Sequence, residues 1–137
     1  MRKGQALASV VLVHFAINVA HGRAHVGAEV PLSPLGMLFV YIVILAAPLA
    51  GLGVWRWRPR LGGWIVAASM GGALVFGLIN HFLIDGSDHV AHVAADWRLL
   101  FGITAMLLVV CELAGTVIGV WAARESIPTW RPASASK

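Results

Sequence analysis

Four apolar stretches, each long enough to cross a lipid bilayer, constrain the fold of this chain more than any other feature. They cover residues 6–26, 35–55, 61–84 and 97–123. A helix of roughly 20 apolar residues spans a hydrocarbon core of about 30 Å. The composition agrees, because 59 % of the residues are hydrophobic and only 12 % are charged. We therefore predict an all-α, four-helix transmembrane domain over residues 1–124, followed by a short polar tail rich in Pro, Ser and Ala over residues 125–137.

The distribution of basic residues predicts the orientation of the four spans. Eight of the ten lysines and arginines fall on one side of a four-span arrangement: Arg2, Lys3, Arg56, Arg58, Arg60, Arg124, Arg131 and Lys137. By the positive-inside rule, both termini lie in the cytoplasm, as in the inner membrane of a bacterium. The net charge of +4 thus reflects topology and not nucleic-acid binding. A cleaved secretory signal is the competing interpretation of the N-terminus, although His14 and Asn18 would be unusual in a signal core.

A polar pattern in the first span recurs in the third. The segment HFAINVAHGRAHVGAE at residues 14–29 matches HFLIDGSDHVAHVAAD at residues 81–96 in five polar positions. The pairs are His14 with His81, Asn18 with Asp85, His21 with Asp88, His25 with His92, and Glu29 with Asp96. On a helix these positions stay within about 60° of one another. The pattern predicts a tandem repeat of two helical hairpins that enter the membrane in the same direction, with paired residues at equal depth. Coincidence between two helices that end in polar caps is the alternative.

The spacing within the repeat is typical of metal ligands. His21, His25 and Glu29 are spaced i, i+4 and i+8, and Asp88, His92 and Asp96 repeat that spacing. Side chains four residues apart share one helix face and can bind a single ion. The predicted metal ligands, on the extracytoplasmic side, are His21, His25, Glu29, Asp85, Asp88, His89, His92 and Asp96. Imidazole with carboxylate favours zinc, nickel, cobalt, iron or copper(II). The leading hypothesis is metal binding linked to uptake, sequestration or delivery, and a solvated loop is the alternative for each residue alone.

Two other classes of function stay open. His14 with His81, and His25 with His92, could ligate two b-type haems about 16 Å apart, as in an electron-transfer or oxidoreductase subunit. The neighbouring carboxylates favour a bare ion over haem. A purely structural subunit of a membrane complex is the third class. Glu112 lies in the middle of the fourth span, where it could accept protons or simply bond to a histidine.

Other site types are not indicated by the sequence. It contains no P-loop, no GxSxG motif, no zinc-finger cysteine pairing and no nucleic-acid module. No catalytic residue is predicted, and the pattern does not decide whether the chain is an enzyme. The expected partners are the lipid bilayer and a metal ion, and a transport role would favour a homo-oligomer or a larger membrane complex. Cys111, the single cysteine, has no disulfide partner within the chain.

Overall fold

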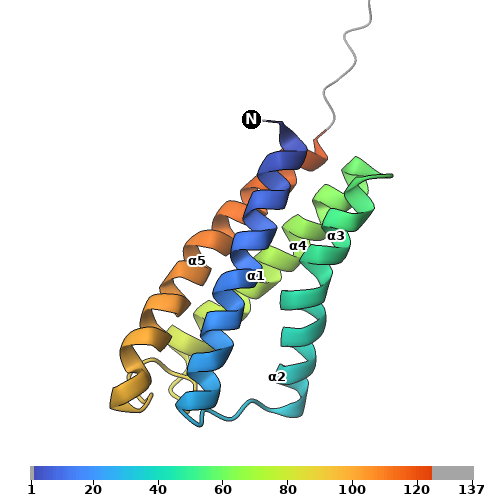
Figure 1. Cartoon of the computed structure of the whole chain (residues 1–137). Coiled ribbons are helices and arrows are strands. Elements are labelled where there is room, and N and C mark those ends of the chain that lie inside the picture. Colours follow the sequence, from blue (N-terminus) through green and yellow to red (C-terminus); the bar gives the residue numbers. More distant parts are fainter. Residues whose placement is uncertain (1, 125–137) are drawn as a thin grey trace, which may run out of the picture.

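A computed structural model describes residues 2–124, and in this part of the chain it is entirely helical, with no strands (Figure 1). The first span is α1 (Lys3–Gly27). The second is continuous over α2 (Pro34–Phe39), the π-helix η1 (Val40–Ala46) and α3 (Ala47–Trp55). The third joins α4 (Pro59–Leu78) to the π-helix η2 (Ile79–Leu83), and the fourth is α5 (Ala95–Ala123).

All four spans are long and apolar enough to cross a membrane. The prediction of an all-α fold with four helices able to span a membrane is therefore confirmed for the described residues. The predicted polar tail, 125–137, lies outside the described residues.

The breaks between the spans follow from local sequence. Ser33 caps α2, because its hydroxyl accepts a hydrogen bond from the backbone nitrogen of Gly36 at 3.0 Å. Pro34 and Pro59 occupy the first turns of α2 and α4. Backbone N–H groups in a first turn have no partner within the helix, so proline, which lacks this group, costs no hydrogen bond there. The connection between α3 and α4 is short, so these helices are antiparallel neighbours.

Small residues bring α4 and α5 into close contact. A Cβ atom added at Gly119 would lie 2.7 Å from the backbone nitrogen of Ala67, and one at Gly63 would lie 2.7 Å from that of Ala123. A Cβ atom at Gly115 would lie 2.6 Å from Met70 Cε. Gly115 and Gly119, four residues apart, thus form one side of an interface of the small-residue type.

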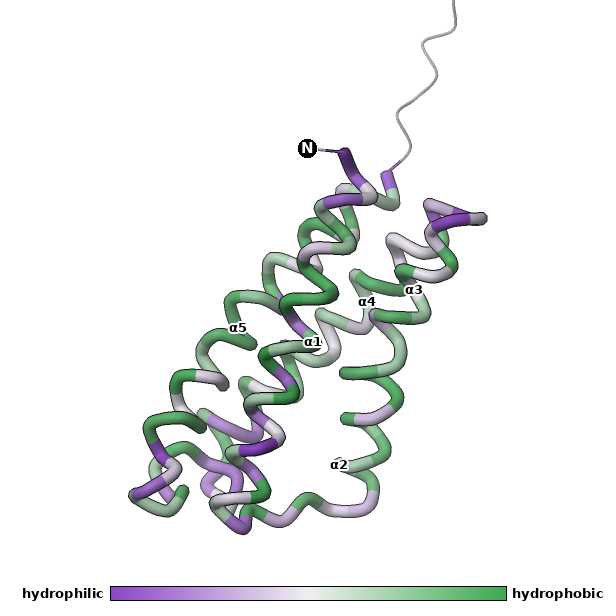
Figure 2. The backbone as a smooth tube through the Cα atoms, viewed as in Figure 1, coloured by the Kyte–Doolittle hydropathy of each residue, from purple (hydrophilic) through white to green (hydrophobic). Residues whose placement is uncertain are grey.

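The two ends of the bundle differ in packing. The beginning of α1, the end of α5 and the connection between α3 and α4 lie together at one end (Figure 1), where Lys3 Nζ donates a hydrogen bond to the Arg124 carbonyl at 2.8 Å. Leu7, Val11, Val66 and Met70 form a buried apolar core. Polar residues gather at the two ends of an otherwise apolar molecule (Figure 2). Toward the opposite end, α1 stays packed on α5, while α2 diverges from α1 (Figure 1).

The predicted helical ladder over residues 81–96 is interrupted. The third span ends at Leu83, Ile84 is extended, with φ −88° and ψ 126°, and α5 begins only at Ala95. The segment between them folds in turns, with His89 N bonded to Gly86 O at 3.1 Å and His92 N to His89 O at 2.9 Å. Gly86 and Ser87 favour such turns over a helix. Asp88, His92 and Asp96 therefore do not share one helix face.

Candidate metal centre

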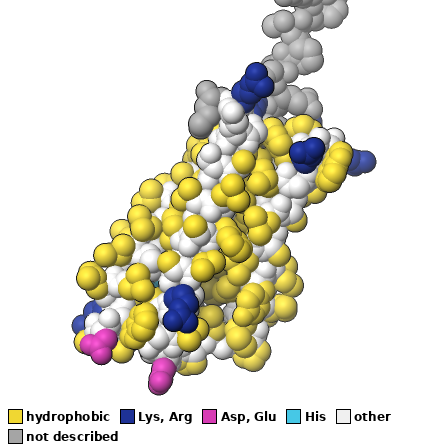
Figure 3. Space-filling model, viewed as in Figure 1, with side chains coloured by type: hydrophobic (Ala, Val, Ile, Leu, Met, Phe, Trp, Pro, Cys, Tyr) yellow, Lys and Arg dark blue, Asp and Glu magenta, His cyan; other side chains and the backbone are white. Residues whose placement is uncertain are grey.

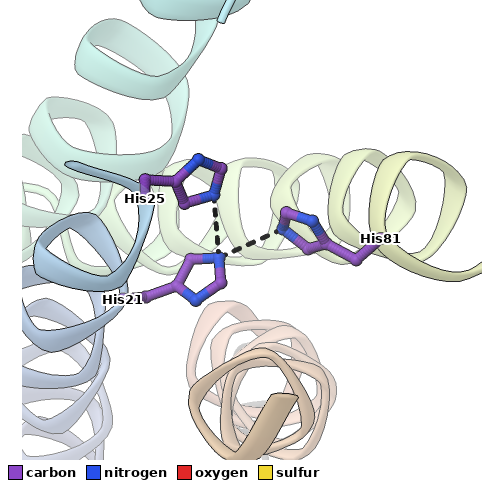
Figure 4. A group of neighbouring side chains, drawn as sticks. All are labelled: His21, His25 and His81. Atoms are coloured by element: carbon purple, nitrogen blue, oxygen red, sulfur yellow. Dashed lines mark hydrogen bonds between the residues drawn. The ribbon is translucent and has the colours of Figure 1, made fainter. Parts of the chain in front are cut away.

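Three histidines converge at the end of the bundle where α2 diverges from α1. His21 and His25 lie one turn apart on α1, and His81 comes from η2 (Figure 4). His21 Nε2 lies 3.2 Å from His25 Nε2 and 3.2 Å from His81 Nε2. The ligand atoms of all three residues lie within 4.8 Å of one another, a grouping that could hold a metal ion. His21 and His81 are buried, at 6 % and 7 % exposure.

Local backbone structure explains why these three rings meet. The i, i+4 spacing places His21 and His25 on one face of α1. His81 lies in a π-helical turn, a wider turn that shifts the direction of the side chains following it. The chain then folds back over His81, whose carbonyl accepts a hydrogen bond from Val90 N at 3.0 Å.

Thr104 of α5 determines the tautomer of His21. The Thr104 hydroxyl donates its hydrogen to the Leu100 carbonyl, with 2.7 Å between the oxygens. It can therefore only accept from His21 Nδ1, which lies 2.9 Å from it. His21 Nδ1 then carries the proton, and His21 Nε2 presents a lone pair to the cluster.

Asp88 determines the tautomer of His81 in the same way. His81 Nδ1 lies 3.1 Å from the Asp88 carbonyl oxygen and 3.2 Å from Asp88 Oδ1. Both oxygens are acceptors, so His81 Nδ1 donates and His81 Nε2 also presents a lone pair. A carboxylate or carbonyl on the outer nitrogen of a histidine is the usual arrangement around protein-bound metals.

When both rings are neutral, these tautomers place no hydrogen on either Nε2 atom where His21 meets His81. Two lone pairs then face each other across 3.2 Å in a buried site, which is repulsive unless a proton or a metal ion lies between them. Nitrogen ligands about 2.0–2.1 Å from a tetrahedral zinc ion are about 3.3–3.4 Å apart. The observed separations of 3.2 Å are close to that value. The two separations from His21 thus fit metal ligands, and all three nitrogen atoms lie within 4.8 Å of one another.

Two buried polar atoms beside the cluster lack a hydrogen bond within the described residues: His25 Nδ1 and Asp88 Oδ1. Asp88 Oδ1 nevertheless lies 3.4 Å from His25 Nε2. The Phe101 ring packs against all three imidazoles, with centroid distances of 4.7, 4.9 and 5.2 Å. Phe101 belongs to α5, so its apolar ring covers the α5 side of the cluster.

The remaining predicted ligands lie outside the three-histidine group. His92 Nε2 lies 3.3 Å from Asp85 Oδ1 in an exposed pair, and the His92 and His89 rings lie 5.4 Å apart. Asp96 is in the first turn of α5. Glu29 follows the end of α1 with a positive φ of 54°. These five predicted ligands lie at the same end of the bundle without joining the cluster.

The predicted pairing of His14 with His81, and of His25 with His92, is corrected by the structure. His81 meets His21 and His25, seven and eleven residues after His14. His14 Nε2 instead lies 3.3 Å from Glu112 Oε1, and Asn18 Nδ2 lies 3.0 Å from the same nitrogen. Seven residues of helix correspond to roughly 10 Å, so these polar groups form a second, deeper layer. The third span has more helix before its histidine than the first, since Pro59 precedes His81 by 22 residues and Lys3 precedes His14 by 11.

Thr104 contacts the candidate site and was not predicted from the sequence pattern. A single threonine in an apolar helix carries no spacing signal, and its hydroxyl usually bonds to its own helix, as Thr104 also does. Comparisons of the chain with family models, with curated proteins and with solved structures gave no match. The function is therefore inferred from the geometry of the site.

Proposed function

We propose that this chain is an integral membrane protein that binds one transition-metal ion through the Nε2 atoms of His21, His25 and His81, in metal uptake, sequestration or delivery. The facing Nε2 atoms of His21 and His81 carry the proposal, because a metal ion between two neutral rings would replace the repulsion of their lone pairs with two bonds. Zinc, nickel, cobalt, iron and copper(II) all accept imidazole ligands.

The surrounding acidic and histidine side chains have supporting roles in this proposal. Asp88 orients His81 and adds negative charge beside the ion. Glu29, Asp85 and Asp96 add negative charge that attracts cations to the same end of the bundle. Glu112, paired with His14, is the proton acceptor below the metal layer.

The proposed orientation places the metal centre on the extracytoplasmic side of a bacterial-type inner membrane, with both termini in the cytoplasm. The basic residues at the opposite end of the bundle support this orientation. A permeation path would require an oligomer or a partner subunit, since four spans enclose little space.

A bare ion is favoured over haem by the packing of the rings. The imidazole centroids of His21, His25 and His81 lie 4.8, 4.9 and 5.7 Å apart. A macrocycle between any two of these rings would have to separate them, whereas a single ion fits between their nitrogens. Electron transfer through a bound redox-active ion is compatible with the same ligands.

Elemental analysis of the purified protein tests the proposal. Wild type is expected to retain about one metal ion per chain, whereas His21→Ala and His81→Ala should weaken binding by more than about 100-fold, because a three-ligand site loses one bond. His89→Ala and His92→Ala are matched controls and should retain wild-type metal. Size-exclusion profiles of all variants report folding. Equal retention in His21→Ala and His92→Ala, or a Soret band in wild type, would contradict the assignment.

A further inference from the structure

An apolar cavity of about 430 Å³ lies next to the three-histidine cluster and has no role in holding the ion. It is enclosed by α1, the α2–η1 segment, α4 and α5. His25, His81, Asn18 and Glu112 are polar lining residues of the cavity on α1, η2 and α5, together with Asp88. Its volume falls within the range of small-molecule sites in proteins.

The mouth of this cavity faces the lipid. Val19 and Val26 on α1, and Tyr41 on η1, line the cavity and are 54 %, 70 % and 63 % exposed. All three lie within membrane-spanning segments. Apolar side chains cover most of the face that α1 and α2 present, and a basic side chain lies toward its lower end (Figure 3). A molecule dissolved in the bilayer can therefore enter between α1 and η1 without crossing water.

The charge of the metal centre favours an anionic head group. Three neutral imidazoles add no charge, so a divalent ion keeps two positive charges and the Asp88 carboxylate offsets one. A net positive charge in a site of low dielectric attracts an anion strongly. The open fourth position is suited to an oxygen ligand.

We propose that the cavity binds a long-chain carboxylic acid from the bilayer, with its carboxylate on the open position of the metal and its hydrocarbon chain between α1 and η1. This inference rests on the proposed metal site and adds the class of ligand that the site takes. The apolar walls of the cavity would pack against the hydrocarbon chain of the acid, and the metal ion would bind its carboxylate.

Photolabelling in lipid nanodiscs tests the proposal. The probe is a palmitic acid with a diazirine in its chain, added to cobalt-loaded protein, and its methyl ester is the comparison. We expect the acid to label residues of α1 and η1 about tenfold more than the ester, which cannot bind the ion as an anion. Removal of cobalt should reduce labelling by the acid to the level of the ester.

Two glycines provide a matched pair of variants. A Cβ atom at Gly22 or at Gly53 would meet nothing within 4 Å, but only Gly22 lines the cavity. Gly22→Phe should fill the mouth and lower labelling about tenfold with metal content unchanged, whereas Gly53→Phe should label as wild type does. Val19→Trp, at the exposed rim of the cavity, should also lower labelling about tenfold and leave the metal content unchanged.

The outcomes separate this inference from the metal site. Full metal content with equal labelling by acid and ester would overturn the carboxylate assignment and leave the metal site standing. Full metal content with labelling unaffected by Gly22→Phe and Val19→Trp would overturn the assignment of this cavity as the binding site of the acid. Wild-type protein without metal would overturn the metal site and this inference together.

Discussion

At the scale of single residues, the chemistry of the candidate centre depends on hydrogen bonds made by the outer nitrogens of its histidines. His21 and His81 lie in the cluster with their Nε2 atoms unprotonated because Thr104 and Asp88 accept from Nδ1. The histidine spacing in the sequence indicates that His21 and His25 share a face. It does not reveal Thr104, whose contribution depends on the packing of α5 against α1.

Thr104→Val should weaken metal binding without removing a ligand. Valine has nearly the same shape as threonine but cannot accept a hydrogen bond from His21 Nδ1. The orientation and tautomer of the His21 ring are then no longer fixed by this bond. We expect an affinity loss of about 10- to 100-fold, measured by competition with a chelator of known affinity. Thr116→Val is the matched control, because Thr116 also donates to a carbonyl of α5, that of Glu112, at 2.8 Å. Equal losses in the two variants would mean that Thr104 does not position His21.

At the scale of helices, the spans are predictable from the sequence, and the alignment of their polar residues is not. Apolar length and the prolines are sufficient to place the four spans. The repeat assumes a regular helix from His81 onward, whereas the structure has a π-helix followed by turns. His81 comes 22 residues after Pro59, where its span begins, whereas His14 comes only 11 residues after Lys3, so His81 lies farther along the bundle, near His21 and His25.

Gly119→Leu should separate α4 from α5 and destabilise the bundle. A Cβ atom there would lie 2.7 Å from the nitrogen and 2.9 Å from the Cα atom of Ala67, both of which belong to the backbone. Overpacking of this kind lowers the free energy of unfolding by about 1–3 kcal/mol, measurable by titration with a denaturing detergent. Gly53→Leu, where the side chain meets open space, should leave the free energy of unfolding near that of wild type. A Gly119→Leu variant as stable as Gly53→Leu would contradict the close contact.

At the scale of the whole molecule, the two ends of the bundle differ in packing and in chemistry. One end holds both ends of the described chain and the apolar core around Leu7 and Met70. The other end holds the histidines and the mouth of the cavity. The basic residues predict which end faces the cytoplasm, but the pairing of α1 with α5 and the divergence of α2 follow from tertiary packing that hydropathy does not encode.

Cysteine labelling in intact bacterial cells checks the proposed orientation. Cys111 is the single cysteine and is buried, so Cys111→Ala provides a background without thiols. Added to that background, Asp85→Cys should react with a membrane-impermeant maleimide from outside the cell. Arg58→Cys, in the connection between α3 and α4, should react only after the cells are permeabilised. The reverse pattern would invert the proposed topology.

X-ray absorption spectroscopy of the zinc-loaded protein tests the central claim most directly, because it counts the ligands of the ion. We predict three imidazole nitrogens at about 2.0–2.1 Å, with the outer-shell scattering of their rings, and one further oxygen ligand. The imidazole contribution should fall to two rings in His81→Ala and stay at three in His92→Ala. A shell of oxygen ligands without imidazole scattering, or a spectrum unchanged by His81→Ala, would contradict a metal centre built on His21, His25 and His81.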